Sequence, residues 1–122
     1  MGNRKKQQAP PGFLTPSGNS HEHHIRLYDN MLDSPAWRSL SNGARTLYIT
    51  ILSQYKGVYS GDTVICPYSY MEEHGIRRGS IPKWLDELKE KGFIKIQGGG
   101  LYKQPNHYEL INDWFHNDQL KQ

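Results

Sequence analysis

The feature that most constrains this chain is an apolar stripe with the period of an α-helix between residues 44 and 55. Apolar side chains recur there at i, i+3, i+4, i+7, i+8 and i+11, as Ala44, Leu47, Tyr48, Ile51, Leu52 and Tyr55. This spacing places all of them on one face of a helix, because the helical period is 3.6 residues. Ser41 or Asn42 is expected to cap the start of this helix, and Gly57 to end it.

The sequence before this helix predicts an extended segment or short strand and a short helix. Residues 25–28 suit a short edge strand or an extended lead-in. Ser34 as N-cap and Pro35 at the first helical position predict a short helix that ends by Leu40, because proline at that position loses no hydrogen bond.

A pair of helices separated by a short turn is predicted further along. Pro67 begins the first of them, which covers residues 68–74, and Gly75 ends it in a left-handed C-cap. The second runs to Lys91, and Gly92 ends it. Its inward side chains are expected to be Ile81, Trp84, Leu85 and Leu88.

The start of the second helix is decided by Pro82. A helix that began at Arg78 would place this proline deep enough to lose a hydrogen bond. Ser80 is therefore favoured as the N-cap, with Pro82 in the first turn and Arg77 and Arg78 in the turn before it.

Short segments rich in β-branched and aromatic residues predict strands at 63–66, 93–96 and 108–111. The last two are joined by a long glycine-rich connection, and the first would complete a three-stranded antiparallel sheet. The order of elements predicts an α+β fold, with a three-helix core, a small three-stranded antiparallel sheet and a β-hairpin.

The 122 residues are enough for one domain. Residues 1–24 are rich in proline, glycine and glutamine and are expected to be a disordered arm, followed by a domain over 25–116 and a tail over 117–122. The single cysteine, Cys66, excludes an internal disulfide and is expected to be a small core residue. The sequence shows neither a signal peptide nor an apolar run of membrane-spanning length, which favours a cytoplasmic location.

Positive charge is unevenly distributed along the chain. The formal net charge is only +3, yet residues 77–103 contain seven basic and three acidic side chains, a net of +4. The arm adds Arg4, Lys5 and Lys6. A concentration of this kind is typical of a surface that faces a polyanion.

Residues 40–114 resemble the winged helix-turn-helix superfamily. Residues 84–94 are similar to that family's junction between recognition helix and wing, where a leucine-rich helix runs into a glycine-hydrophobic-isoleucine step. Residues 41–48, with Asn106, His107, Tyr108 and Trp114, further resemble short helix-turn-helix proteins of bacterial plasmids, phages and conjugative elements. The resemblance implies a sequence-specific double-stranded DNA-binding protein, an accessory factor of replication or transfer, with a transcriptional regulator as an alternative.

The entrance of the second helix of the pair is the expected contact with the major groove. The side chains predicted to lie there are Arg77, Arg78, Gly79, Ser80, Pro82 and Lys83. Either arginine could pair with guanine or clamp a phosphate.

The hairpin is the second expected contact, because consecutive glycines let backbone N–H groups approach phosphates. Its residues are Lys95, Gly98, Gly99, Gly100, Tyr102, Lys103 and Gln104. If about six phosphates are neutralised in all, the logarithm of affinity should fall with the logarithm of salt at a slope of roughly −5.

Asp86, Glu87 and Glu90 oppose this interpretation, because carboxylates on the outward side of the helix repel phosphates. The helix must then enter the major groove by its N-terminal end alone. A winged helix used as a protein-interaction module is the competing hypothesis. Pairing of the two arginines with the protein's own carboxylates, leaving a neutral or negative face, would count against DNA.

Motifs for catalysis, for phosphate-binding loops and for zinc are missing from the sequence, so neither an enzyme, nor a cofactor, nor a metal site, nor a small-molecule substrate is expected. The expected partners are double-stranded DNA and, as open possibilities, a second copy of the chain or other DNA-processing proteins. Trp37, Trp84 and Trp114 are expected to be packing residues.

Overall fold

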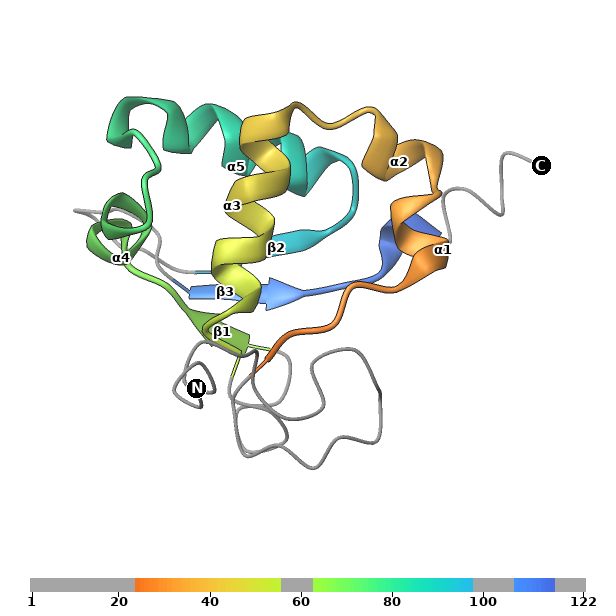
Figure 1. The fold of residues 1–122 in the computed structure, drawn as a ribbon, viewed down its shortest axis with the longest axis horizontal. Helices are drawn as coiled ribbons and strands as arrows, with labels where there is room; N and C mark the ends of the chain where they lie inside the picture. Colours follow the sequence, from red (N-terminus) through yellow and green to blue (C-terminus); the bar gives the residue numbers. More distant parts are fainter. Residues whose placement is uncertain (1–23, 56–62, 98–106, 116–122) are drawn as a thin grey trace, which may run out of the picture.

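The computed structural model describes residues 24–55, 63–97 and 107–115. Its elements mix helices and strands along the chain (Figure 1), which confirms the α+β class. In order they are α1 (Asp29–Leu32), α2 (Pro35–Arg38), α3 (Asn42–Leu52), β1 (Thr63–Ile65), α4 (Tyr68–Glu73), the 3-10 turn η3 (Arg78–Ser80), α5 (Ile81–Glu90), β2 (Ile94–Gln97) and β3 (His107–Leu110).

The strands form the predicted three-stranded antiparallel sheet, and their order in it is β1-β3-β2. Val64 of β1 and Ile96 of β2 lie opposite Tyr108 of β3 on either side. Val64, Ile94 and Tyr108 are buried, so one face of the sheet belongs to the core. The two hairpin strands are each shifted by one residue from the expected bounds, and residues 25–28 form the extended lead-in rather than a strand.

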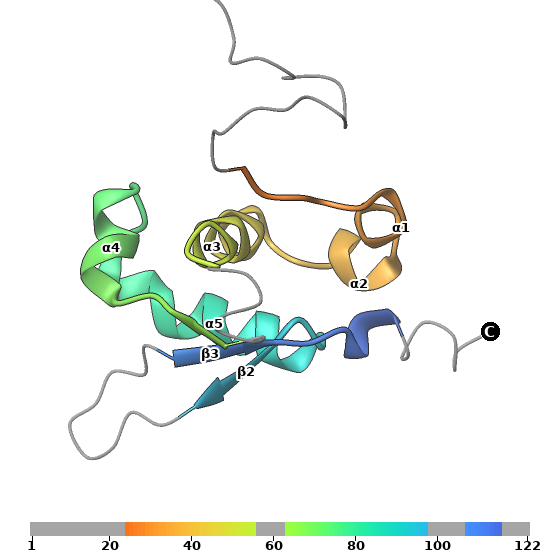
Figure 2. The same ribbon diagram turned by 90° about the horizontal axis from the view of Figure 1, so that it is seen from below.

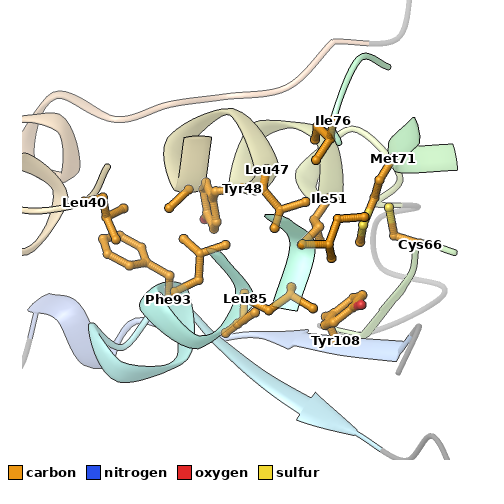
Figure 3. Close-up of a cluster of buried hydrophobic side chains, with 14 of the residues drawn as sticks. Leu40, Leu47, Tyr48, Ile51, Cys66, Met71, Ile76, Leu85, Phe93 and Tyr108 are labelled. Carbon is orange, nitrogen blue, oxygen red and sulfur yellow. The ribbon is translucent and has the colours of Figure 1, made fainter. Parts of the chain in front are cut away.

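The core lies between α3, α5 and the sheet. In Figure 1, α3 crosses α5 and the sheet. The view from below shows that α3 lies in a separate layer, with α5 and the sheet on the same side of it (Figure 2). Leu47 and Ile51 of α3 meet Leu85 of α5 and Tyr108 of β3 across this space (Figure 3). The predicted apolar stripe of α3 is therefore confirmed as the centre of the core, apart from Leu52 and Tyr55, which are only partly buried.

The start of α3 is fixed by two caps. The Ser41 hydroxyl accepts a hydrogen bond from the Ala44 amide at 3.2 Å, so Ser41, one of the two expected candidates, is the N-cap. The Glu87 carboxylate, from α5, in turn accepts hydrogen bonds from the amide and the hydroxyl of Ser41, both at 2.8 Å. The expectation that Glu87 points outward is therefore wrong. α3 itself ends at Leu52, before Gly57, which lies outside the described residues.

We expect Glu87→Ala to lower the free energy of unfolding by about 1–2 kcal/mol, because both hydrogen bonds to Ser41 are lost at the start of the central helix. Urea unfolding followed by tryptophan fluorescence measures this loss. Glu90→Ala is the matched control, since Glu90 is an exposed carboxylate on the same helix. Equal losses in the two variants would contradict the role given to Glu87.

Short helices precede α3 and are tied to it by hydrogen bonds. Ser34 caps α2 through the Trp37 amide at 3.1 Å, with Pro35 at the first position, as predicted. Arg45 of α3 donates to the backbone oxygens of Trp37 and Arg38 at 3.2 and 3.0 Å. Its guanidinium therefore satisfies the last carbonyls of α2. Within the described ranges, no helix is long and apolar enough to cross a membrane.

Candidate nucleic-acid interface

The turn between α4 and α5 is anchored to the core at both ends. α4 ends with Gly75 at a φ of 87°, and the amides of Gly75 and Ile76 donate to Glu72 O and Met71 O at 3.0 and 3.1 Å. These two hydrogen bonds form a Schellman motif. Ile76 and Met71 are both buried, which adds the apolar contact that accompanies this motif. The turn therefore holds α4 and the start of α5 in a fixed relation.

The start of α5 differs from the expected one in its cap. Pro82 lies in the first turn of α5, as predicted, and Ser80 is the residue before the helix. The Ser80 side chain, however, makes no capping hydrogen bond, and its backbone is already helical, with φ −93° and ψ −13°. The reason is η3, which begins the right-handed winding at Arg78 and leaves Arg77 in an extended conformation. We call residues 77–83 the leading segment.

The leading segment is exposed on one side and anchored on the other. Ile81, Leu85 and Leu88 of α5 are buried, as predicted. Trp84 is only half-buried, because its indole ring lies over Gly43 of α3 instead of entering the core. The opposite side presents most of the predicted contact residues to solvent, namely Arg77, Arg78, Gly79, Pro82 and Lys83, with Ser80 half-buried beside them.

The two arginines differ in their surroundings. The Arg78 guanidinium Nη1 lies 2.8 Å from Glu72 Oε1, and the guanidinium carbon lies 5.2 Å from the centre of the Tyr68 ring. The Arg77 side chain makes no hydrogen bond, ion pair or ring contact with the part of the chain that the structure describes. Both arginines are exposed, and the pairing with the protein's own carboxylates that would count against DNA is present at Arg78 and absent at Arg77 within the described residues.

Positive charge in space is more local than the count along the sequence suggested. Arg77, Arg78 and Lys83 gather at the leading segment, while Lys89 and Lys91 lie toward the other end of α5. Over residues 68–90 there are four basic and five acidic side chains, so the helix pair as a whole is nearly neutral. Among the described residues of the helix pair, the exposed basic side chains Arg77, Arg78 and Lys83 thus gather at the leading segment, with Glu72 beside Arg78.

The hairpin contact is only partly within the described residues. Gly98, Gly99, Gly100, Tyr102, Lys103 and Gln104 lie outside them. Lys95 lies mid-strand opposite Glu109, and strand alternation turns it away from buried Ile94, to the face of the sheet opposite the core. It therefore does not join the leading segment. The end of β2 and the start of β3, where the hairpin strands open, lie at the same end of the molecule as α4 and the start of α5 (Figures 1 and 2).

Residues expected to have packing roles do so. Cys66 is fully buried, and burial raises the pKa of its thiol to about 12, so it is protonated at neutral pH. Trp37 is buried, and the Trp114 ring stacks on Phe93. Across residues 24–55, 63–97 and 107–115, no group of three or more histidine, cysteine or acidic side chains could hold a metal ion.

The contact between Glu72 and Arg78 is the feature of the site that sequence reasoning missed. Its trace in the sequence is an acidic residue in the first helix of the pair and a basic residue of opposite charge in the turn that follows it. Comparison of the chain with models of known families, with characterised proteins and with solved structures returned no match.

Proposed function

We propose that this chain is a sequence-specific, double-stranded DNA-binding protein of winged helix-turn-helix type, and that the leading segment enters the major groove. The observation that carries the proposal is the exposure of Arg77, Arg78 and Lys83 at the N-terminal end of α5. The opposite side of this ten-residue helix is buried in the core. A helix end fits a groove about 12 Å wide, and arginine and lysine pair there with guanine or with flanking phosphates.

Two of the three carboxylates of α5, those of Glu87 and Glu90, are compatible with insertion of the helix by its N-terminal end. Glu87 is engaged with Ser41, so its charge is directed toward the start of α3. Asp86 is exposed only about 4.5 Å along the helix axis from Lys83, so it opposes a phosphate near the leading segment, whereas Glu90 is exposed at the last position of α5. A helix rises about 1.5 Å per residue, so Glu90 stands roughly 10 Å beyond Lys83. Tilting α5 away from the duplex separates Glu90 from the phosphates.

The hairpin supports the same orientation. Its strands open at the end of the molecule that also holds α4 and the start of α5 (Figure 1). A connection leaving the sheet there starts on the side where the leading segment would meet DNA. We propose this connection, which includes Gly98, Gly99 and Gly100, as the wing that contacts the neighbouring backbone.

The biological role that we propose rests on the resemblance of residues 41–48 and 84–94 to proteins of mobile elements. It is that of an accessory factor that binds an origin during plasmid or conjugative replication or transfer. Regulation of transcription by the same contact is the alternative within DNA binding. A second copy of the chain bound at a paired half-site suits either role.

A protein partner is the second candidate, and the charge of the helix pair favours it. With four basic and five acidic side chains over residues 68–90, this surface has little net attraction for a polyanion outside the leading segment. A mixed-charge face of this kind suits another protein. The two candidates differ in how DNA affinity should respond to the charge of the leading segment. DNA binding requires the affinity for duplex to rise with added positive charge and fall with added negative charge, whereas a protein partner does not.

Gly79 offers a position at which this charge can be changed without disturbing the fold. A Cβ atom added there would meet nothing within 4 Å, and its backbone is not in the left-handed region. We expect Gly79→Glu to weaken binding to duplex DNA by about tenfold or more, and Gly79→Lys to strengthen it several-fold, because one phosphate contact is opposed or added. Fluorescence anisotropy with a labelled duplex at low salt measures both.

The two Gly79 variants control for each other, because both add a long side chain and differ in the sign of its charge. Thermal unfolding should be the same for both within error. Equal affinities for duplex DNA in the two variants would argue against the leading segment as the contact. Loss of a protein partner with DNA affinity unchanged would favour the interaction module.

A further inference from the structure

We infer that Arg78 is the side chain of the leading segment that reads a guanine, and that Glu72 and Tyr68 are positioning residues that hold it for this task. In the same scheme, Arg77 contacts phosphate. The inference rests on the proposed function, since it assigns separate tasks to two arginines of the same DNA-binding site.

Arg78 is held from two directions. The carboxylate of Glu72 binds one guanidinium nitrogen at 2.8 Å, and the ring of Tyr68, itself buried, lies under the guanidinium carbon at 5.2 Å. The side chains of Arg78 and Glu72 keep 47% and 41% of their surface exposed, so the pair stands at the surface. A guanidinium has five N–H donors in a rigid plane, so donors remain for a ligand in solution.

A side chain fixed in this way is suited to reading a base. Recognition of guanine requires two parallel hydrogen bonds to O6 and N7, which demands a defined orientation of the guanidinium plane. An arginine that is already ordered loses less conformational freedom when it forms these bonds. Binding sites that require a defined geometry generally use neighbouring side chains to hold the contacting residue in one conformation.

Charge favours a base over a phosphate as the ligand of Arg78. The Glu72 carboxylate largely cancels the positive charge of the guanidinium and repels a phosphate that approaches it. The edge of guanine is uncharged and offers two acceptors, so it does not suffer this repulsion. Within the site, the paired arginine is therefore better matched to a base edge than to the backbone.

Arg77 has the opposite character. It lies directly before Arg78, is exposed, and has no side-chain partner in the described part of the chain. No residue of the described ranges compensates its charge or fixes its orientation. These properties suit a contact with phosphate, which adds affinity without adding sequence information.

The test is selection from duplexes with a randomised core, carried out with the full chain and its single-site variants. The unchanged chain should enrich a motif that contains at least one strongly preferred guanine. Arg78→Lys should reduce the preference for that guanine by about tenfold or more, because a bidentate pair is lost. Arg77→Lys and Arg77→Ala should leave the motif unchanged, and Arg77→Ala should weaken binding to all sequences alike.

Glu72→Gln tests the positioning residue, with Glu73→Gln as its matched control. Both remove one negative charge from the end of α4, and Glu73 is exposed and does not touch Arg78. Both should raise the affinity for random duplex several-fold, since repulsion of phosphate falls. Only Glu72→Gln should also diminish the preference for the guanine that Arg78→Lys affects.

The outcomes separate this inference from the function on which it rests. Identical motifs for Glu72→Gln and Glu73→Gln would overturn the role of Glu72. A motif that depends on Arg77 and not on Arg78 would overturn the division between the arginines. Enrichment of no duplex by the unchanged chain, with its thermal unfolding intact, would overturn the proposed function itself.

Discussion

Phe93→Ala is expected to lower the free energy of unfolding by about 3–5 kcal/mol, the usual range for removing a fully buried aromatic ring. Phe93 is 0% exposed. Its ring lies 5.7 Å from that of Trp37, 5.5 Å from that of Tyr48 and 6.0 Å from that of Trp114, measured between centroids. The cavity left by alanine would open between α2, α3 and the segment after β3 at once.

Urea unfolding followed by tryptophan fluorescence measures this loss, because two of the neighbouring rings are indoles. A domain of ordinary stability has about 5–15 kcal/mol in total, so the variant should unfold at much lower urea or fail to fold. Tyr28→Ala is the control, since Tyr28 is 60% exposed. A loss below about 1 kcal/mol for Phe93→Ala would contradict the aromatic cluster.

Gly92→Ala is expected to destabilise the protein considerably more than Gly75→Ala. Both glycines have a left-handed backbone, with φ of 85° and 87°, which costs an alanine roughly 1–2 kcal/mol. At Gly75 a methyl group would meet nothing within 4 Å. At Gly92 it would lie 2.7 Å from the Trp114 amide nitrogen and 2.9 Å from the Asp113 carbonyl carbon.

The extra cost at Gly92 reflects the close approach of the segment after β3, which also donates from the Trp114 amide to Gly92 O at 3.1 Å. Overpacking of this kind adds about 1–3 kcal/mol, because backbone cannot move aside as a flexible side chain can. Gly75→Ala is the matched control, with the same backbone conformation and open space. Equal losses in the two variants, measured by urea unfolding, would show that the segment does not pack against Gly92.

Features set by local chemistry could be predicted from the sequence. The caps at Ser34 and Ser41 and the helix ends at Gly75 and Gly92 were identified correctly, because each depends on residues within one turn of the chain. The stripe of α3 and the three strands followed from periodicity and β-branching. The strand predicted to begin at Phe93 begins at Ile94 instead. The Phe93 amide donates to Leu88 O and so completes the end of α5 before β2 begins.

Features set by contacts between elements could not be predicted. Glu87 was assigned to solvent because the residue that it caps, Ser41, is 46 positions away in the sequence. Trp84 has the spacing of a core residue, but α3 offers it the open surface of Gly43. The pairing of Arg78 with Glu72 depends on how the turn folds back, which charges along a sequence do not specify.

The distribution of charge shows the same limit. The excess of basic residues over positions 77–103 predicted one positive surface. In the fold, Lys95 faces the far side of the sheet, and Lys89 and Lys91 lie toward the other end of α5, so among the described basic residues of this window only Arg77, Arg78 and Lys83 stay together. A window of sequence sums residues that the fold then distributes over different faces.

Titration of a labelled duplex of mixed sequence with the full chain, at several salt concentrations, is the most direct test of the DNA-binding surface. If Arg77 and Lys83 each neutralise a phosphate, the logarithm of the affinity should fall with the logarithm of salt at a slope of about −2 or steeper. The variant carrying Arg77→Ala and Arg78→Ala should bind more weakly, with a shallower slope and unchanged thermal unfolding. Binding that is absent at low salt, or that is the same in the folded double variant, would contradict DNA recognition by the leading segment.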